Sequence, residues 1–218
     1  MENKIREFLI NNGAAQVGFC KAGENPFSLP YAISFTVPLS DAIVDSIDAA
    51  PTHTYFHHYR SVNTLIDNIS LRCGILLARE GYRYAPIPAS QSVNGMQGIY
   101  SHKRAATEAG LGTIGKSSLF ISNEFGPRVR LGTILTDCQF PVPEITPPDV
   151  CKDCNLCTES CPAMAITGSK WEPGAPLENI IDAKACSDYM KRAFQHIGRG
   201  VVCGICMRVC PHGQNKHI

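Results

Sequence analysis

The chain has 218 residues, which is enough for one or two domains. Its 20 basic and 19 acidic residues leave a formal net charge of +1 and form no basic tract, so we expect no nucleic acid partner. The charged N-terminal residues lack the apolar core of a signal peptide, and no apolar run reaches the length of a membrane span. These features predict a soluble, cytoplasmic protein without membrane contact, and they leave its oligomeric state open.

Hydrophobic periodicity and turn residues predict interleaved helices and strands in the N-terminal part of the chain. Helices are expected at 2–12, 41–49, 55–80 and 102–109. Strands are expected at 15–20, 31–37, 82–87, 118–122 and 129–136, and several are rich in β-branched and aromatic residues. The proline-rich stretch 140–148 then predicts a boundary between a mixed α/β domain at 1–140 and a second domain at 148–218.

Two short stretches of this first domain invite a ligand-binding interpretation. His57 and His58 are adjacent, but neighbouring positions of a helix point to different faces, so we do not expect them to bind one metal ion together. Residues 110–117 (GLGTIGKS) satisfy the pattern of a phosphate-binding P-loop, with Lys116 and Ser117 as its polar side chains. A P-loop follows a buried strand and opens a helix, whereas here a helix is expected before the glycines and a strand after them. Nucleotide binding is therefore the weakest hypothesis.

The strongest signal lies in the last third of the chain, which contains eight of its eleven cysteines. The first group has the spacing C-x2-C-x2-C-x3-C-P, which is typical of bacterial ferredoxins with two 4Fe–4S clusters. The second group has two cysteines and a Cys-Pro pair, and Cys186 lies upstream of it as the missing ligand. Counting ligands gives one cluster bound by Cys151, Cys154, Cys157 and Cys210. The other is bound by Cys161, Cys186, Cys203 and Cys206.

Zinc sites and disulfides are the alternatives for such a cysteine-rich segment. Structural zinc takes two ligand pairs separated by a spacer, which does not match the first group. Disulfides are rare in a reducing cytoplasm. Cys20, Cys73 and Cys138 fall outside both groups, and we expect them to be structural residues.

The residues at 106–119 and 131–137, together with the cysteine groups and the sequence Cys186-Ser-Asp-Tyr189, resemble the epoxyqueuosine reductase family. Those enzymes depend on cobalamin and are related to the reductive dehalogenases. The order of elements is similar over nearly the whole chain. The resemblance implies an α+β protein, in which a nitroreductase-like mixed α/β domain precedes a bacterial-type ferredoxin-like domain with two 4Fe–4S clusters.

The resemblance also implies roles for particular residues. Gly112, Gly115, Lys116 and Ser117 would lie near the corrin of a bound cobalamin, where glycines permit close backbone approach. The cluster of Cys186 would be nearer the cobalamin, and the other cluster would receive electrons first from an external donor of the ferredoxin or flavodoxin type.

Two departures from the family pattern concern its reaction. The loop 90–100 (SQSVNGMQGIY) has no acidic residue where the family has an aspartate proton donor, and a simple offset puts Met96 at that place. Tyr100 or His102 would then donate the proton, although either is equally expected as a polar residue at a helix start. The chain also stops soon after the last cysteine, without the family's C-terminal extension, so we do not expect tRNA as its substrate.

Three functional hypotheses follow. The first is an iron–sulfur reductase that passes electrons through two clusters to a cobalamin in the N-terminal domain, with an unidentified substrate. The second is a non-catalytic electron-transfer partner that reduces a separate corrinoid protein, and the missing aspartate favours it. The third is the P-loop nucleotide-binding protein already described.

Overall fold

The structure is a computed structural model, and it describes residues 1–93, 95–142, 144–200 and 202–214. Contacts divide the chain into two compact units. The first contains Met1–Pro38, Ser61–Thr113 and Val129–Pro147, and the second contains Leu39–Arg60, Ile114–Arg128 and the residues from Pro148 onward. The expected boundary near residue 148 coincides with one joint between these units. Two earlier segments join the cysteine-rich part in the second unit, and the division into folding domains at 1–140 and 148–218 stays a prediction.

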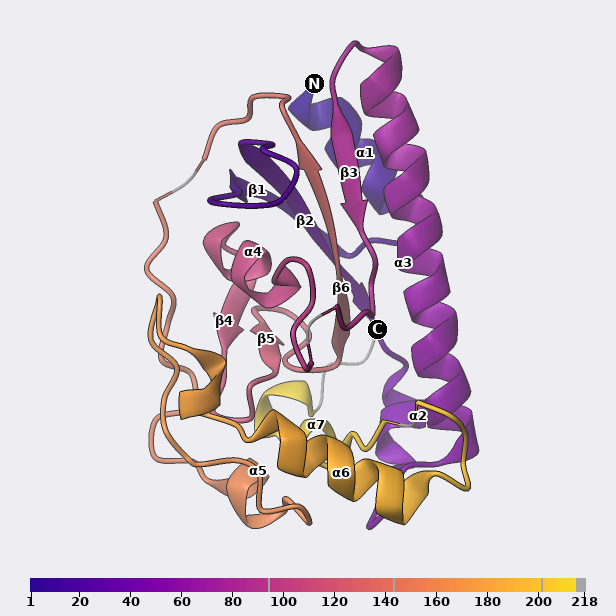
Figure 1. Cartoon of the computed structure of the whole chain (residues 1–218), viewed down its shortest axis with the longest axis vertical. Helices are drawn as coiled ribbons and strands as arrows, with labels where there is room; N and C mark the ends of the chain where they lie inside the picture. Colours follow the sequence, from indigo (N-terminus) through magenta and orange to yellow (C-terminus); the bar gives the residue numbers. More distant parts are fainter. Residues whose placement is uncertain (94, 143, 201, 215–218) are drawn as a thin grey trace. The chain divides into compact units, whose positions relative to one another are not determined.

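A four-stranded antiparallel sheet forms the centre of the first unit (Figure 1), with the strand order β1-β2-β6-β3. Its strands are β1 (Gln16–Lys21), β2 (Tyr31–Pro38), β3 (Tyr84–Ile87) and β6 (Val129–Thr136). All four were predicted, with ends that differ by at most two residues. Their interiors are buried and rich in β-branched and aromatic side chains, which pack well on a pleated surface.

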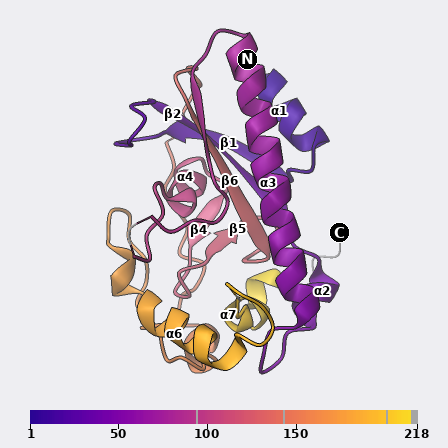
Figure 2. The same cartoon turned by 45° about the vertical axis from the view of Figure 1, so that its right-hand side comes forward.

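Side chains of β1 alternate between the two faces of this sheet, as the period of two requires. Phe19 faces helix α1 (Glu2–Asn11), where the guanidinium of Arg6 lies 5.1 Å from its ring centroid. Gly18 and Cys20 face helix α4 (His102–Glu108), and the Cys20 thiol donates a hydrogen bond to the Ala105 carbonyl. Figure 2 shows α1 and α4 on opposite sides of the sheet, so both faces are covered.

The long helix α3 (His53–Arg79) was predicted at 55–80, and it passes from the second unit into the first at Ser61. The Thr52 hydroxyl accepts a hydrogen bond from the Tyr55 amide and satisfies one of the free donors of the first turn. Within the first unit, α3 lies beside α1, and Arg72 donates a hydrogen bond of 2.8 Å to Asn12. The short helix α2 (Asp41–Asp45) ends four residues before the predicted end at 49.

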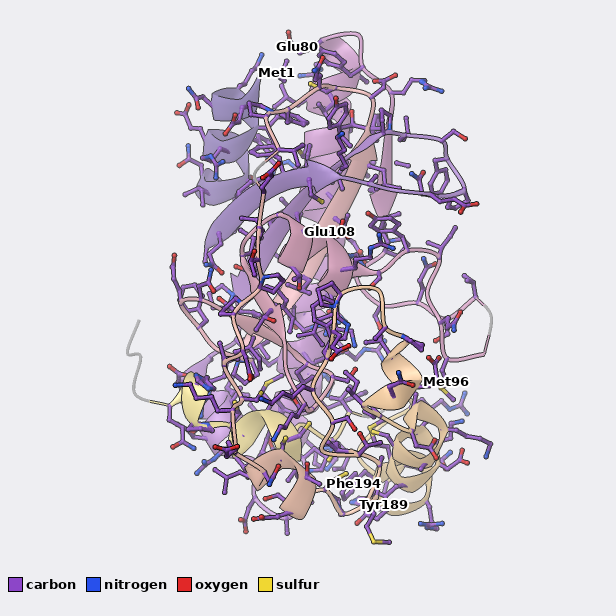
Figure 3. All side chains as sticks on the ribbon, turned by 90° about the vertical axis from the view of Figure 1, so that its left-hand side faces the viewer. Met1, Glu80, Met96, Glu108, Tyr189 and Phe194 are labelled. Carbon is purple, nitrogen blue, oxygen red and sulfur yellow. The ribbon has the colours of Figure 1, made fainter. Side chains whose placement is uncertain are left out.

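The second unit has short helices joined by cysteine-containing loops: α5 (Leu156–Glu159), α6 (Ala183–Phe194) and α7 (Ile205–Arg208). Two 3₁₀ turns lie at Leu177–Asn179 and Pro211–Gly213. Phe56, Phe194 and Ile197 form a small buried cluster against which Tyr189 packs. The rings of Tyr189 and Phe194 meet edge to face at 5.6 Å (Figure 3). Helix α6 was not predicted from the sequence, because cysteine-containing loops surround it.

The glycine-rich stretch differs from a P-loop in its local structure. Gly112–Ile114 forms strand β4, and Phe120–Ser122 forms strand β5, which pairs with it in a two-stranded sheet. A tight turn joins them, in which the Gly115 amide donates to the Leu119 carbonyl. The stretch therefore forms a strand, a turn and a second strand, whereas a P-loop consists of a strand, a loop and a helix. The strand predicted at 118–122 is confirmed, and β4 was not predicted.

Candidate iron–sulfur centres

The first predicted ligand set comes together in the second unit. Cys151 and Cys154 lie on the loop that enters α5, Cys157 lies in the first turn of α5, and Cys210 follows α7. Burial and, to a smaller extent, the neighbouring thiolates of Cys151, Cys157 and Cys154 raise the pKa of Cys210 to about 11. Burial also raises the pKa of Cys157, with Cys151 and Cys154 adding to the effect. Thiols that perturb one another in this way are near neighbours.

The second predicted set is coupled in the same manner. Burial raises the pKa of Cys203 to about 11, and Cys186 and Cys161 contribute to that shift. Burial again dominates at Cys206, where the negative charges of Cys203, Cys186 and Cys161 raise the pKa further. The thiolates that raise the pKa of each cysteine thus belong largely to its own predicted set. One exception is Cys157, whose charge also raises the pKa of Cys206.

Local structure positions these thiols. The Asp182 carboxylate caps the N-terminus of α6 by accepting from the Ala185 amide, which sets Cys186 in the first turn of that helix. Gly204 has φ +80°, a left-handed conformation that lets the chain turn between Cys203 and Cys206. Pro211 begins a 3₁₀ turn directly after Cys210, and the Cys161 sulfur accepts a hydrogen bond from the Ala165 amide at 3.4 Å.

The donor set fits iron–sulfur chemistry. All eight of these cysteines are partly exposed and free of disulfides, whereas Cys20, Cys73 and Cys138 are buried, as expected for structural residues. In the described part of the chain, no three histidine, cysteine or acidic side chains converge as ligands of one metal ion would. A 4Fe–4S cluster binds one thiolate at each of four irons, so its ligands surround a volume rather than a single point.

The turn between β4 and β5 contributes directly to the first cysteine set. The backbone amide of Lys116 donates to the Cys151 sulfur at 3.5 Å. The Lys116 ammonium donates to the Cys154 carbonyl at 3.1 Å and to the Asn155 side-chain oxygen at 3.0 Å. A Cβ placed on Gly115 would lie 3.2 Å from the Cys151 sulfur, so glycine permits this close approach.

The residues predicted to contact a corrin are thus engaged with the protein itself. Lys116 and Ser117 are each 6% exposed, and the Ser117 hydroxyl accepts from the Leu119 amide. Gly112 is buried on β4. Their assignment to a cobalamin stays a prediction. The contact of Lys116 with the cysteine loop was not predicted from the sequence.

The two predicted proton donors lie in the first unit. The Tyr100 hydroxyl donates to the Ala22 carbonyl at 2.9 Å, and burial raises its pKa. His102 has one ring nitrogen 2.8 Å from the Thr133 hydroxyl and the other 3.0 Å from the Pro88 carbonyl, and burial lowers its pKa. A carbonyl can only accept, so the neutral ring places its proton toward Pro88. Met96, which a simple offset in sequence places where the family has its acid, is 48% exposed; Figure 3 labels it.

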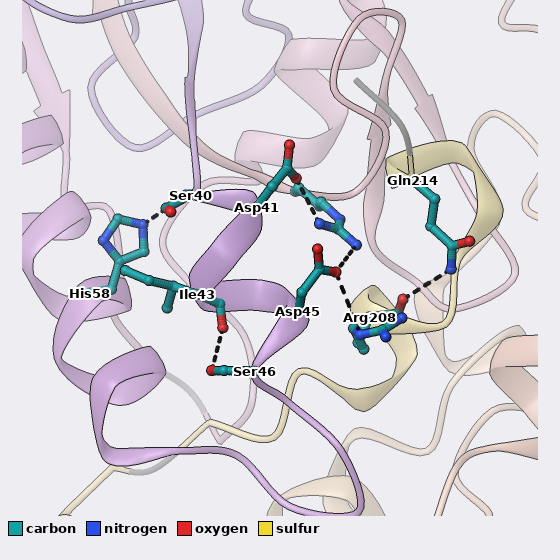
Figure 4. A network of polar contacts seen from close by, with 9 residues as sticks. Ser40, Asp41, Ile43, Asp45, Ser46, His58, Arg208 and Gln214 are labelled. Atoms are coloured by element: carbon teal, nitrogen blue, oxygen red, sulfur yellow. Dashed lines mark hydrogen bonds and ion pairs between the residues drawn. The ribbon is translucent and has the colours of Figure 1, made fainter. Parts of the chain in front are cut away.

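His58 has a structural contact rather than a metal ligand geometry. Its Nε2 accepts a hydrogen bond from the Ser40 amide at 3.0 Å (Figure 4), and burial lowers its pKa. The neighbouring His57 instead meets the Phe56 ring edge to face. The expectation that the pair does not bind one ion together agrees with this arrangement.

An ion-pair network around the buried Arg128 lies beside the last cysteine group. The Arg128 guanidinium, 3% exposed, bonds the carboxylates of Asp41 at 2.6 Å and Asp45 at 2.8 Å. Arg208, which lies on α7 between Cys206 and Cys210, is 3.5 Å from Asp45 (Figure 4). The hydrogen bond from Arg128 lowers the pKa of Asp45. These partners are more than 80 positions apart in sequence, so no local pattern could have indicated them.

Comparisons with known proteins agree with this cysteine chemistry. Residues 150–213 match the 4Fe-4S double cluster binding domain. An epoxyqueuosine reductase of Vibrio cholerae is 28% identical over 200 residues, which cover 84% of this chain and 47% of that protein. The tetrachloroethene reductive dehalogenase of Sulfurospirillum multivorans is 33% identical over 136 residues, 59% of this chain and 26% of that enzyme. The chain therefore spans less than half of the length of these curated relatives.

Solved structures share the fold. A catabolic reductive dehalogenase superposes with a TM-score of 0.75 at 20% identity, over 96% of this chain and 31% of that one. The epoxyqueuosine reductase of Streptococcus thermophilus superposes with a TM-score of 0.64 at 18% identity, over 99% of this chain and 67% of that one. The described part of the chain contains no helix with the length and apolar character needed to cross a membrane. The chain is thus a mixed α/β protein with a 4Fe-4S double cluster binding domain, and it is similar to epoxyqueuosine reductases and to a reductive dehalogenase.

Proposed function

We propose that the chain is an iron–sulfur oxidoreductase that passes electrons through two 4Fe–4S clusters to a cobalamin bound by its N-terminal part. Cys151, Cys154, Cys157 and Cys210 would hold one cluster. The other would be held by Cys161, Cys186, Cys203 and Cys206. The proposal includes a nitroreductase-like fold before residue 140 and a ferredoxin-like fold after 148. The observation that carries it is that eight partly exposed cysteines, free of disulfides, lie within the segment that matches a 4Fe-4S double cluster binding domain.

The chain's own groups would set the properties of these centres. Thiolates bind the irons, and backbone amides of Lys116 and Ala165 donate to the sulfurs of Cys151 and Cys161. Such hydrogen bonds, together with burial and net charge, tune the reduction potential of a cluster. An external ferredoxin-type or flavodoxin-type donor would supply the electrons, because the reaction consumes them.

The proposal that the chain binds cobalamin rests on its similarity to solved structures. One of the similar structures is a reductive dehalogenase described as suggesting a mechanism for B12-dependent dehalogenation, with a TM-score of 0.73 and 20% identity. The side chains of Lys116 and Ser117 do not fit a role at the corrin, because both are buried and bonded within the protein. We therefore derive no reaction step through the cofactor. The substrate is not identified, and tRNA is not proposed.

A second candidate is a non-catalytic electron carrier that reduces a separate corrinoid protein. One observation favours it: both candidate proton donors are already bonded internally, Tyr100 to Ala22 and His102 to Thr133 and Pro88. A proton donor of a reductase has to reach its substrate. The described residues of the loop at 90–100 include no acidic side chain that could act instead of Tyr100 or His102.

The decisive experiment is anaerobic purification after supplying cobalamin, followed by an ultraviolet–visible spectrum with iron and cobalt analysis. About eight irons and about one cobalt per chain, with corrinoid bands, are expected for the cobalamin reductase. About eight irons without cobalt would favour the electron carrier. Iron well below that number after anaerobic reconstitution would overturn both candidates.

Single cysteine substitutions test the ligand assignment. We expect Cys210→Ser and Cys206→Ser each to lose one cluster, so that iron falls to about half of its starting value. Mössbauer and electron paramagnetic resonance spectra of the two variants should each keep a different cluster signal. Cys138→Ala, at a buried cysteine outside both sets, is the matched control and should keep all of its iron. Loss of the same signal in both variants would contradict the assignment.

A further inference from the structure

Lys116 is a buried cation among the ligands of the first cluster. Its side chain is bonded to the Cys154 carbonyl and to Asn155, and its backbone amide is bonded to the Cys151 sulfur. These contacts tie the turn after β4 to both ends of the loop that carries Cys151 and Cys154. The residue is only 6% exposed.

A purely structural role would explain the two oxygen contacts, since a buried ammonium needs acceptors. It would not explain why a full positive charge is buried at this loop rather than a neutral donor. Reduction adds one electron to a cluster and its four thiolates, which makes the site more negative. A nearby cation with little solvent screening favours that more negative state, and so does an N–H donor aimed at a ligand sulfur.

We propose that Lys116 is a positioning residue that raises the reduction potential of the cluster held by Cys151, Cys154, Cys157 and Cys210. This inference rests on the proposed function, because it requires that cluster to form. The GLGTIGKS stretch, which resembles a phosphate-binding loop in sequence, is then part of the iron–sulfur site. Its glycine admits the Cys151 sulfur, and its lysine supplies the charge.

The test is a redox titration of the purified, cluster-loaded protein, followed by electron paramagnetic resonance. Lys116→Met should shift the midpoint of this cluster to a more negative potential and leave the cluster of Cys186 unchanged. Lys116→Arg keeps the charge and should shift the midpoint less. Lys152→Met is the matched control, because Lys152 lies on the same loop but is exposed, so solvent screens its charge.

Iron content distinguishes a failure of this inference from a failure of the proposed function. A Lys116→Met protein with full iron and an unshifted midpoint would overturn this inference and leave the proposed function intact. Wild-type protein that binds no clusters would overturn the proposed function instead. If Lys116→Met does not fold, Asn155→Asp replaces it, because a carboxylate beside the ammonium offsets the charge. That variant should shift the same midpoint in the same direction, and an unshifted midpoint would count against the inference.

Discussion

Arg128 shows how one side chain can organise residues from three distant segments. Its guanidinium is almost fully buried and bonds two carboxylates on α2, while the aliphatic part of the side chain packs against Gly213. A Cβ added to Gly213 would lie 2.9 Å from the Arg128 Nε, so the backbone after Cys210 packs directly against the arginine side chain. Arg128 therefore supports the segment that carries the last predicted iron ligand.

At the residue scale, we predict that Arg128→Met lowers the free energy of unfolding by about 2 kcal/mol. Each charge-assisted hydrogen bond contributes about 1.5–3 kcal/mol, and rehydration of the freed carboxylates offsets part of the loss. The measurement is the urea midpoint of the anaerobically purified protein.

Arg83→Met is the control for this substitution. Arg83 also pairs with a carboxylate, that of Asp137, but its side chain is 70% exposed. We expect a change of about 0–1 kcal/mol there, as for other exposed pairs. Equal losses in the two variants would mean that burial of Arg128 does not determine its contribution.

At the scale of elements, the fit between β1 and α4 depends on small side chains. Gly18 pairs with Ser34, and Cys20 pairs with Ala32, so the face of the sheet toward α4 is flat at these positions. A Cβ on Gly18 would lie 2.6 Å from the Ala109 carbonyl oxygen, which is closer than real contacts permit. The helix can therefore approach the sheet only because residue 18 is glycine.

We predict that Gly18→Ala destabilises the fold by about 1–3 kcal/mol, the usual effect of forcing extra volume into a packed interior. Gly98→Ala makes the same chemical change where the nearest atoms are 3.6 Å away, and it should stay within about 0.5 kcal/mol of wild type. Thermal unfolding of both variants side by side measures the difference. A Gly18→Ala protein as stable as Gly98→Ala would show that α4 moves away from the sheet without penalty.

At the scale of the whole molecule, the two units depend on different sources of stability. The first has a continuous sheet core, in which Ile33, Phe35, Ile134 and Leu135 are fully buried. The segment after Pro148 has short helices, long connections and few fully buried apolar side chains. Small domains with so little core commonly rely on metal binding for their stability.

We predict that removal of iron with an oxidant and a chelator selectively unfolds the segment 150–213. Hydrogen–deuterium exchange should show loss of amide protection around Cys154, Cys161 and Cys210, while β2 and β6 remain protected. Anaerobic reconstitution with iron and sulfide should restore the protection. Simultaneous loss of protection in the sheet would contradict independent stabilisation of the two units.

The sequence by itself determined the strands of the central sheet, the long helix and the double-cluster segment, because these depend on local periodicity and on cysteine spacing. The period of two in 31–37 and the helical period in 55–80 are properties of neighbouring residues. The spacing of the first cysteine group reflects how a short loop surrounds a cluster. Each of these signals lies within one stretch of chain.

Only the tertiary structure decided what Lys116 and Arg128 contact. Both belong to patterns that are ambiguous locally: the first completes a phosphate-loop motif, and the second follows a Gly-Pro turn. Their partners lie 38 and 87 positions away, at Cys154 and Asp41. A buried charge takes whichever acceptors the folded chain brings within reach, so its role depends on long-range packing that local periodicity does not encode.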